Sequence, residues 1–586
     1  MLVLFCLARA ATATEVFIQL PPEAQGLQGH LSRASITMQT VAREDATPQD
    51  IIAAARAEYA RLSGALYEVG RYGGVISVLV DGREAAEMSP FATPQAPRQI
   101  LLRVQPGPQF TFSQATVRPL APGTELPEGF RTGQPAFSGL VADAAQAGQR
   151  RWRDTGHAKV DVAEQNITAN HNARALAADI VLAPGPRLTF GNLVITNPGD
   201  VRPERVRAIA GLPTGEVYSP AALEEAAQRL RRTGAFSSVA LQDAERIGPG
   251  NTLDINATLT DARPRRIGFG AEISSLEGLT LSGFWMHRNL FGGAERLRLE
   301  GEVGGIGGNS GGIDYIFSAR YERPATFTPD TTLYLGARVQ DLDEPEYSER
   351  SVRVGAGVTH IFNDTLTGDL GFAYQYADIR DDLGTRELEH LLFPASLTYD
   401  TRDDPLDAKK GIMVDFELTP LVGLGNNSLG ARLFLDSRSY FTFGANDGLT
   451  FATRGQFGSV TGAGLTEVPP EMLFFSGGAG TVRGQPYQSL AVLLAPGVEI
   501  GGRTFAAVSA ELRADITDTW QVVGFADGGF VGASSMSFDN GDEHYGAGFG
   551  IRYKTGLGPI RFDVATPLDS DAGRDFEIYV GIGQAF

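Results

Sequence analysis

A proline recurs at a fixed interval in the first half of this chain, and this repeat constrains the fold more than any other feature of the sequence. Pro108, Pro186 and Pro264 are each 78 residues apart. The first two stand in matching surroundings, Val-Gln-Pro-Gly-Pro-Gln-Phe-Thr-Phe at 104–112 and Leu-Ala-Pro-Gly-Pro-Arg-Leu-Thr-Phe at 182–190. A repeat of this length indicates tandem copies of one small module.

The copy at 185–264 is the clearest. Ser219 is a good helix N-cap, with Pro220 in the first helical position. The pattern predicts the order β-α-α-β-β, with a strand at 188–195, helices at 202–210 and from 220, and strands at 236–241 and 253–259. We therefore predict three modules, at 14–106, 107–184 and 185–264. The plainer alternative is three ordinary α+β domains with unrelated roles.

The first residues read as a secretory signal. Met1–Ala10 is a short apolar run, and 11–13 offer small residues for cleavage. We predict a signal peptide at 1–13; because a basic start is missing, a truncated signal whose true start lies upstream is the alternative. The single cysteine, Cys6, lies inside it, and the bulky Phe5 before it disfavours a lipoprotein signal. Cleavage would leave a chain without cysteine, which is neither a disulfide scaffold nor a thiol enzyme.

From 265 to 586 the chain consists of short alternating segments and turns rich in glycine, which makes up 71 of the 586 residues. In one segment Tyr315 and Phe317 share one face, while Asp314 and Arg320 share the other. A polar face carrying so many charges suits the lumen of a wide barrel with lipid outside. We count sixteen strands, an even number as a bacterial barrel requires. A soluble all-β domain is the alternative.

Several functional classes are disfavoured by the sequence. The net charge of −19 argues against a nucleic-acid partner. No Gly-Lys-Ser/Thr phosphate loop is visible, and the seven histidines are scattered without metal-ligand spacing. We expect no catalytic residue, no metal and no cofactor. The carboxylates at 400–404 favour a turn, although a paired set could also bind a cation.

Three motifs carry a family resemblance. The first is Gly-Gly-Ala-Gly-Thr-Val-Arg-Gly at 477–484, inside a loop of about 40 residues, a length that is rarely without function. The second is Asp-Thr-Arg-Asp-Asp-Pro at 400–405, followed by Lys410-Gly411. The third is the segment 576–586, which ends on phenylalanine. Together they resemble the Omp85 superfamily of outer-membrane assembly and translocation barrels, and the repeated modules resemble its POTRA (polypeptide-transport-associated) domains.

The resemblance implies three tandem POTRA-like modules followed by a 16-stranded transmembrane β-barrel at 265–586. Three modules resemble the autotransporter assembly subunit of the translocation and assembly module, since the general assembly factor usually has five and two-partner secretion proteins have two. The implied function is insertion of autotransporter-type β-barrel clients through a lateral seam. The alternative is a two-partner-type secretion pore that passes an unfolded polypeptide.

The resemblance also implies a location and partners. The barrel would lie in the bacterial outer membrane, in contact with its lipid, with the modules in the periplasm. The implied partners are an inner-membrane-anchored, periplasm-spanning TamB-like protein and unfolded outer-membrane β-barrel clients. No enzymatic activity is implied.

A latch inside the lumen is predicted around the long loop. A guanidinium inside a barrel needs carboxylate partners, and a bidentate contact fixes a loop well. Glu511 is expected to face the lumen, and Asp527 matches the acidic motif of the family in the next strand. The predicted latch is Arg483, Gly484, Glu511 and Asp527. The plainer alternative is a generic polar lining.

One departure from the family motif concerns the residue after Arg-Gly. The family usually has an aromatic residue there, whereas here Gln485 and Pro486 precede Tyr487. The aromatic contact is therefore expected to be displaced.

A lateral seam is predicted between the first strand, about 266–275, and the last, about 575–586. A closed barrel has no free edge, so accepting a client strand requires one pair of strands to part. Glycine weakens strand packing and permits a bend. The predicted seam residues are Gly270, Gly581, Gly583 and Phe586. Alternatively, the glycines only accommodate bulky neighbours.

Overall fold

The computed structural model describes residues 14–88, 97–197, 199–274, 278–308, 311–425, 428–444, 448–556, 558–568 and 576–586. The predicted signal peptide at 1–13 lies outside these residues. The chain divides into two compact units, and the division passes through the third module. The first unit comprises Met1–Asn192, Pro213–Glu224 and Asp243–Ile255, and the second comprises Leu193–Leu212, Glu225–Gln242 and Asn256–Phe586. No helix within the described ranges is long and apolar enough to cross a membrane.

The first module packs helices on a four-stranded sheet of order β1-β4-β2-β3. Its long helix α3 begins after Thr47, whose side chain forms a capping box with Asp50. The apolar face of α3, which includes Leu62 and Leu66, packs on the sheet. The elements are β1 (Glu15–Gln19), η1 (Pro22–Leu27), α1 (Gln28–Ala34), α2 (Ile36–Val41), α3 (Pro48–Glu68), β2 (Val75–Val80), β3 (Arg83–Glu84), η2 (Ala85–Glu87) and β4 (Gln99–Gln105).

The second and third modules each contain a three-stranded sheet. The strand order is β5-β7-β6 in the second module and β8-β10-β9 in the third. Gly107 and Gly185, 78 residues apart, both adopt φ +68°, so the repeat is visible in the backbone. In the second module α4 is the only helix among the described residues, because prolines and glycines interrupt 119–137. The elements are β5 (Thr111–Arg118), α4 (Ser138–Asp154), β6 (Asp161–Asn170), β7 (Ala175–Ala183), β8 (Thr189–Ile195), α5 (Pro203–Ala210), α6 (Pro220–Arg232), β9 (Phe236–Asp243), η3 (Pro249–Asn251) and β10 (Thr252–Asp261).

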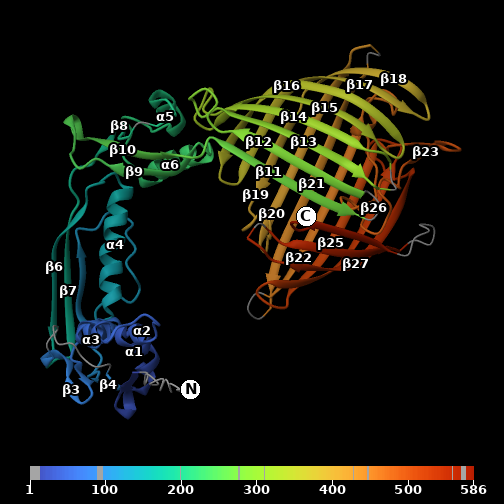
Figure 1. Cartoon of the computed structure of the whole chain (residues 1–586). Helices are drawn as coiled ribbons and strands as arrows, with labels where there is room; N and C mark the ends of the chain where they lie inside the picture. The colour runs from blue at the N-terminus through green and yellow to red at the C-terminus, as the bar shows by residue number, and fades with distance from the viewer. Residues whose placement is uncertain are drawn as a thin grey trace, which may run out of the picture. The chain divides into compact units, whose positions relative to one another are not determined.

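The remainder of the chain forms a closed antiparallel barrel (Figure 1). Its strands are β11 (Arg265–Ser274), β12 (Gly278–His287), β13 (Arg296–Ile306), β14 (Asp314–Arg323), β15 (Thr331–Asp343), β16 (Tyr347–Asn363), β17 (Leu366–Asp381), β18 (Gly384–Leu392), β19 (Ala395–Asp400), β20 (Gly411–Gly423), β21 (Leu429–Phe443), β22 (Leu449–Thr461), β25 (Thr504–Asp515), β26 (Trp520–Gly532), β27 (Gly541–Tyr553), β28 (Ile560–Pro567) and β29 (Glu577–Ile582).

The prediction of sixteen strands is confirmed. β18 and β19 are two pieces of one strand, because both pair with β17 on one side and with β20 on the other. The interruption falls at Pro394, which has no N–H to donate to a ladder. The predicted last strand, which extends to residue 586, is too long, because β29 ends at Ile582.

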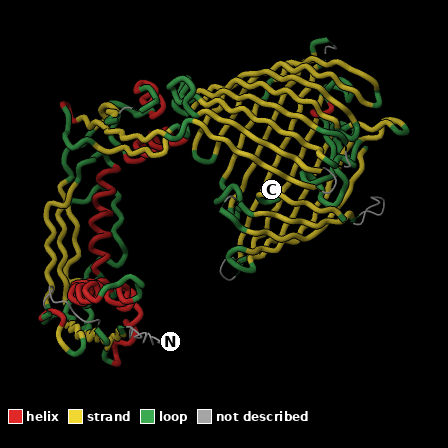
Figure 2. The backbone as a smooth tube through the Cα atoms, viewed as in Figure 1, coloured by secondary structure: helices red, strands yellow, loops and turns green. Residues whose placement is uncertain are grey.

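The two faces of the barrel wall differ as the alternation predicts. Phe317 and Phe372 are exposed on the outside, whereas Arg320 and Arg338 line a cavity inside the lumen. We call the end where β11 begins and β29 ends the proximal end, and the opposite end the distal end. The strands form a continuous wall between these ends (Figure 2).

A long loop at 462–503 joins β22 to β25 at the distal end. It contains η5 (Pro470–Met472) and a small hairpin of β23 (Val492–Ala495) and β24 (Val498–Ile500). Much of the loop is buried, including Val468, Leu473 and Val482. The loop therefore folds into the lumen that the wall encloses and does not stand above the barrel.

Candidate functional site

The structure brings the predicted latch residues together. The Arg483 side chain donates to both carboxylate oxygens of Asp527, through Nε at 2.7 Å and Nη2 at 2.9 Å. Its Nη1 donates to Oε1 of Glu511 at 2.6 Å. The Arg483 guanidinium lies over the ring of Phe525, 3.6 Å from its centre. This is a bidentate, charge-assisted contact in a buried site, since Arg483 is 2% exposed. Its role as a latch stays a prediction.

Gly484 is held against the barrel wall beside Arg483. Its φ is +92°, and a Cβ at this position would lie 2.7 Å from the main chain of Thr566 on β28. Its N–H donates to the hydroxyl of Tyr579 on β29 at 3.1 Å. Glycine is therefore required both by the backbone conformation and by the close approach of two main-chain segments, the loop tip and β28.

The departure after the Arg-Gly pair also has a structural outcome. The Gln485 side chain donates to the carbonyl of Tyr545 on β27 at 2.8 Å. Tyr487 reaches Glu344 at 3.3 Å instead of the wall beside the latch. The aromatic side chains beside the loop tip are therefore Phe525 and Tyr579, both supplied by the wall.

Three further charged residues that sequence reasoning did not place in the latch complete a buried cluster. Arg513 contacts Glu511 at 2.7 Å, and Asp563 lies 3.7 Å from Arg483 and pairs with Arg552. None of these three side chains is more than 1% exposed. The parity of their strands could have shown that they face the lumen. Their contacts depend on the register between distant strands, which the sequence does not contain.

The base of the long loop is bound to another part of the wall. Glu471 accepts hydrogen bonds from Arg353 on β16 and Gln375 on β17, each at 2.6 Å. The tip, in contrast, is bound to β25, β26 and β29. Because β16 and β17 are separated from β26 by many intervening strands, the loop crosses the lumen from one side of the barrel to the other. A cavity of about 580 Å³ remains between Glu471 and the wall.

Few described residues pair across the seam between β11 and β29. Within the described residues only Ile273–Val580 and Ser274–Tyr579 are paired, whereas β11 and β12 share ten pairs. Arg561 on β28 crosses Gly581 to reach Glu272 on β11 at 2.6 Å. A Cβ on Gly581 would lie 3.2 Å from this arginine, so glycine leaves room for the ion pair. Opening of the seam stays a prediction.

The other predicted seam residues do not all lie at the seam. Gly270 faces Ser282 of β12, toward the proximal end from the paired residues. Gly583 lies beyond β29 at φ +103° and turns the chain inward. Phe586 packs inside the barrel against Ala408, Tyr440 and Ala452. The placement of Phe586 at the seam is therefore wrong, because the turn at Gly583 removes it from the wall.

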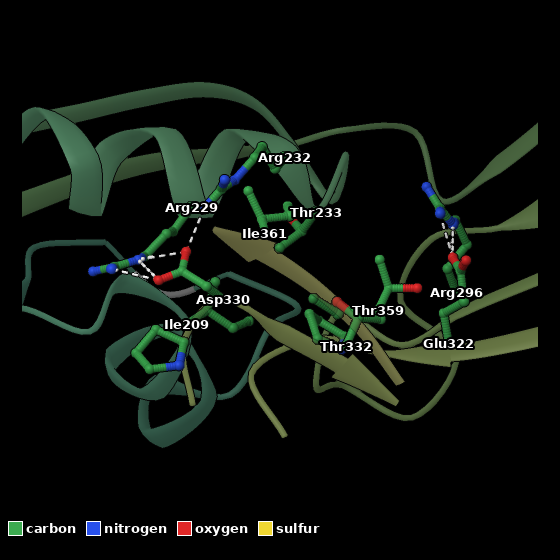
Figure 3. Close-up of a pocket in the computed structure, with 13 residues that line it drawn as sticks. Ile209, Arg229, Arg232, Thr233, Arg296, Glu322, Asp330, Thr332, Thr359 and Ile361 are labelled. Atoms are coloured by element: carbon green, nitrogen blue, oxygen red, sulfur yellow. Dashed lines mark hydrogen bonds and ion pairs between the residues drawn. The ribbon is translucent and has the colours of Figure 1, made fainter. Parts of the chain in front are cut away.

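A charged pocket of about 180 Å³ lies within the second compact unit at the proximal end (Figure 3). Asp330, in the turn before β15, accepts hydrogen bonds from Arg229 and Arg232 of α6, at 2.6 Å and 2.7 Å. Burial alone would raise the pKa of Asp330, but the two arginines hold this pKa below its ordinary value of 3.8.

The described residues include no group of three His, Cys, Asp or Glu side chains placed to hold a metal ion. The carboxylates at 400–404 have protein partners. Asp400 is bound to Arg402, and Asp403 accepts the N–H groups of Lys409 and Lys410. The contacts of residues 400–404 are those of a turn, as the sequence predicts. The expected absence of metal and cofactor stays an expectation.

Comparison with known proteins gives the family. The model of the Omp85 superfamily domain matches residues 289–586. The chain belongs to the Omp85 superfamily. Outer envelope protein 80 of the chloroplast of Oryza sativa subsp. japonica is 25% identical over 423 residues, which cover 65% of this chain and 60% of the relative. The outer membrane protein assembly factor BamA of Neisseria meningitidis serogroup B is 24% identical over 482 residues, 72% of this chain and 59% of the relative.

Solved structures agree with the Omp85 fold. BamA from Haemophilus ducreyi lacking POTRA domains 1–3 has a TM-score of 0.64 at 17% identity, and the match covers 81% of this chain and 100% of that one. CdiB from Acinetobacter baumannii has a TM-score of 0.51 at 11% identity, covering 82% and 90%. These similarities concern the fold alone. This Omp85 chain spans somewhat over half the length of the curated relatives it matches.

Proposed function

We propose that this Omp85 chain is an outer-membrane assembly factor that inserts other β-barrel proteins through the seam between β11 and β29. The observation that carries the proposal is the contrast between the lumen and the wall. The long loop crosses the lumen and is fixed at both ends, whereas β11 and β29 are joined by two residue pairs among the described residues. The name of the Neisseria relative, an assembly factor, supports the same function.

The energy for insertion would come from folding of the client, since a new strand gains hydrogen bonds that the membrane interior cannot supply. Among the described residues, opening the seam breaks two residue pairs and one ion pair. Backbone groups left unpaired in the membrane interior cost several kcal/mol each, because no water replaces the broken hydrogen bonds. Opening is therefore favourable only as a client strand takes over these hydrogen bonds.

Autotransporter-type clients and a TamB-like partner form the finer part of the proposal. Three POTRA-like modules support the autotransporter assembly subunit of the translocation and assembly module (TamA). Within the described residues, β6 of the second module pairs only with β7, so one of its edges is free for an added strand. The modules would then lie in the periplasm, where an inner-membrane-anchored partner can reach them.

A disulfide across the seam tests the proposal. Ile273 and Val580 are opposite each other, so Ile273→Cys with Val580→Cys places two thiols within bonding reach. A Cys6→Ser background removes the single natural cysteine. We expect oxidation to stop assembly of a β-barrel client in proteoliposomes, and reduction to restore it, because the locked seam cannot part.

The matched control keeps Val580→Cys and moves its partner to the other neighbouring strand. Phe562 on β28 faces Val580, so Phe562→Cys with Val580→Cys locks β28 to β29 and leaves the seam free. This crosslink should leave assembly unchanged. If the seam crosslink forms fully and assembly continues, the proposal is wrong. Polypeptide conduction through the lumen would then support the secretion-pore alternative.

A further inference from the structure

The buried cluster around Arg483 extends well beyond a loop contact. Three arginines and three carboxylates lie together where the loop tip meets the wall, at no more than 4% exposure: Arg483, Arg513, Arg552, Glu511, Asp527 and Asp563. Their formal charges balance. A buried charge that loses its partner is strongly unfavourable, so displacement of one member forces its neighbours to rearrange. In a cluster of this kind, displacement of one charged side chain therefore shifts the others as well.

One end of the cluster holds the segment that follows β29. We call residues 583–586 the inner segment. Arg513 donates to the main-chain oxygen of Phe586 at 3.3 Å, and Arg552 donates to the side chain of Gln584 at 3.0 Å. Gln584 in turn donates to Asp407 of the proximal turn 401–410 at 2.8 Å. The inner segment is thus bound inside the barrel by the same arginines that pair with Glu511 and Asp563.

The other end of the cluster is the loop tip. Arg483 reaches Arg513 through Glu511, and it reaches Arg552 through Asp563. Gly484 adds a direct contact, because its N–H donates to Tyr579. Tyr579 belongs to one of the two described residue pairs of the seam, opposite Ser274. The loop tip therefore contacts the last strand directly and the inner segment through two arginines.

We propose that Arg513 and Arg552 are positioning residues that couple the loop tip to the inner segment, so that withdrawal of the tip frees both β29 and residues 583–586. In the closed state the loop holds the last strand from inside. When Arg483 leaves, Glu511 and Asp563 lose charge compensation, their arginines shift, and the inner segment is released. This inference rests on the proposed function for its purpose, the gating of client insertion.

A thiol reporter on the inner segment tests the coupling without any client. Ala585 packs against the cluster that holds Phe586, so Ala585→Cys in a Cys6→Ser background reports release of the segment. The full chain in liposomes is labelled with a water-soluble maleimide. Arg483→Met should raise the labelling rate about tenfold, although no hydrogen bond or ion pair of Arg483 involves residues 583–586. Arg483→Met with Asp527→Asn, which keeps the charges balanced, should have the same effect.

The route of coupling is tested by a double-mutant cycle. Arg513→Met alone should also raise labelling, and the combination with Arg483→Met should be clearly less than the product of the single effects, because both act on one chain of contacts. Arg513→Lys keeps a charge beside Glu511 and should restore part of the protection. Tyr579→Phe removes the acceptor for Gly484 and should raise labelling less than Arg483→Met.

The control is Arg438→Met. Arg438 is another lumen arginine bound to a carboxylate, Asp436, which keeps Arg454 as a second partner. This variant should leave labelling within about twofold of wild type. Labelling that stays at the wild-type rate in both Arg483 variants overturns the coupling. If the coupling is observed but no client is assembled by the wild type, the proposed function fails and the coupling stands.

Discussion

At the scale of single residues, Gly484 is a loop-tip position where both the backbone conformation and a neighbouring main chain oppose substitution. Gly484→Ala would force a Cβ to 2.7 Å from the main chain of Thr566 at a φ of +92°. Such backbone strain costs on the order of 1–3 kcal/mol. We expect the barrel to fold, with heat-modifiable migration on gels, and client assembly to fall at least about tenfold.

The same loop offers a matched control for this prediction. A Cβ added at Gly480 would meet no other atom within 4 Å, so Gly480→Ala should behave as wild type. Equal activity of the two alanine variants would show that the position of the loop tip does not matter for assembly.

The latch shows what could be predicted from residue types and what could not. Alternation along 504–513 places Glu511 in the lumen, the resemblance to the family's acidic motif implies the same for Asp527, and the buried guanidinium requires such partners. The contact between Gly484 and Tyr579 could not be predicted, because it depends on the register of β28 and β29 against a loop about 95 residues earlier. The alternation along a strand indicates which face of the wall a residue lies on, but not its position along the barrel axis.

At the scale of elements, the largest difference between sequence and structure concerns the last strand. Residues 576–586 alternate to their end, so the pattern predicts a strand as far as 586. The turn at Gly583 instead sends the chain inward, and its N–H donates to the carbonyl of Pro559. The buried site around Tyr440 and Ala452 that receives Phe586 is formed by distant strands, so local alternation cannot report it.

The contact between α6 and the turn before β15 gives a pH prediction. The folded-state pKa of Asp330 is lowered, so its contribution is present above the ordinary value of 3.8 and is lost as pH falls through the lower, folded-state value. Asp330→Asn should speed hydrogen exchange in residues 225–242 about tenfold near neutral pH. The difference between variant and wild type should disappear once the wild-type carboxyl is protonated.

Glu225→Gln is the control for this comparison. Glu225 also pairs with Arg229, at 2.7 Å, but it belongs to α6 itself and makes no bridge to the turn. Its substitution should change exchange little at any pH. A difference between Asp330→Asn and wild type that persists at low pH would contradict the assignment to this carboxyl.

At the scale of the whole barrel, the lumen is obstructed at two levels. The long loop crosses it between Glu471 and Arg483, and the inner segment meets the turn 401–410 near the proximal end. A wall of sixteen strands encloses enough space for an aqueous channel when nothing fills it. The obstruction is therefore a property of the loop and the inner segment and not of the wall.

Removing the loop should open this channel. Replacing 464–501 with a short Gly-Ser linker, together with Asp527→Asn to avoid an unpaired buried charge, leaves the pairing of β22 with β25 intact. We expect a folded barrel whose single-channel conductance in planar bilayers is at least about threefold higher than wild type. Trimming only 493–498, where Leu493 and Leu494 are exposed, removes no part of the loop that crosses the lumen and should leave conductance unchanged. Equal conductance of the loop-free barrel and the wild type would mean that the inner segment and the proximal turn are enough to close the lumen, and that the loop acts on the seam alone.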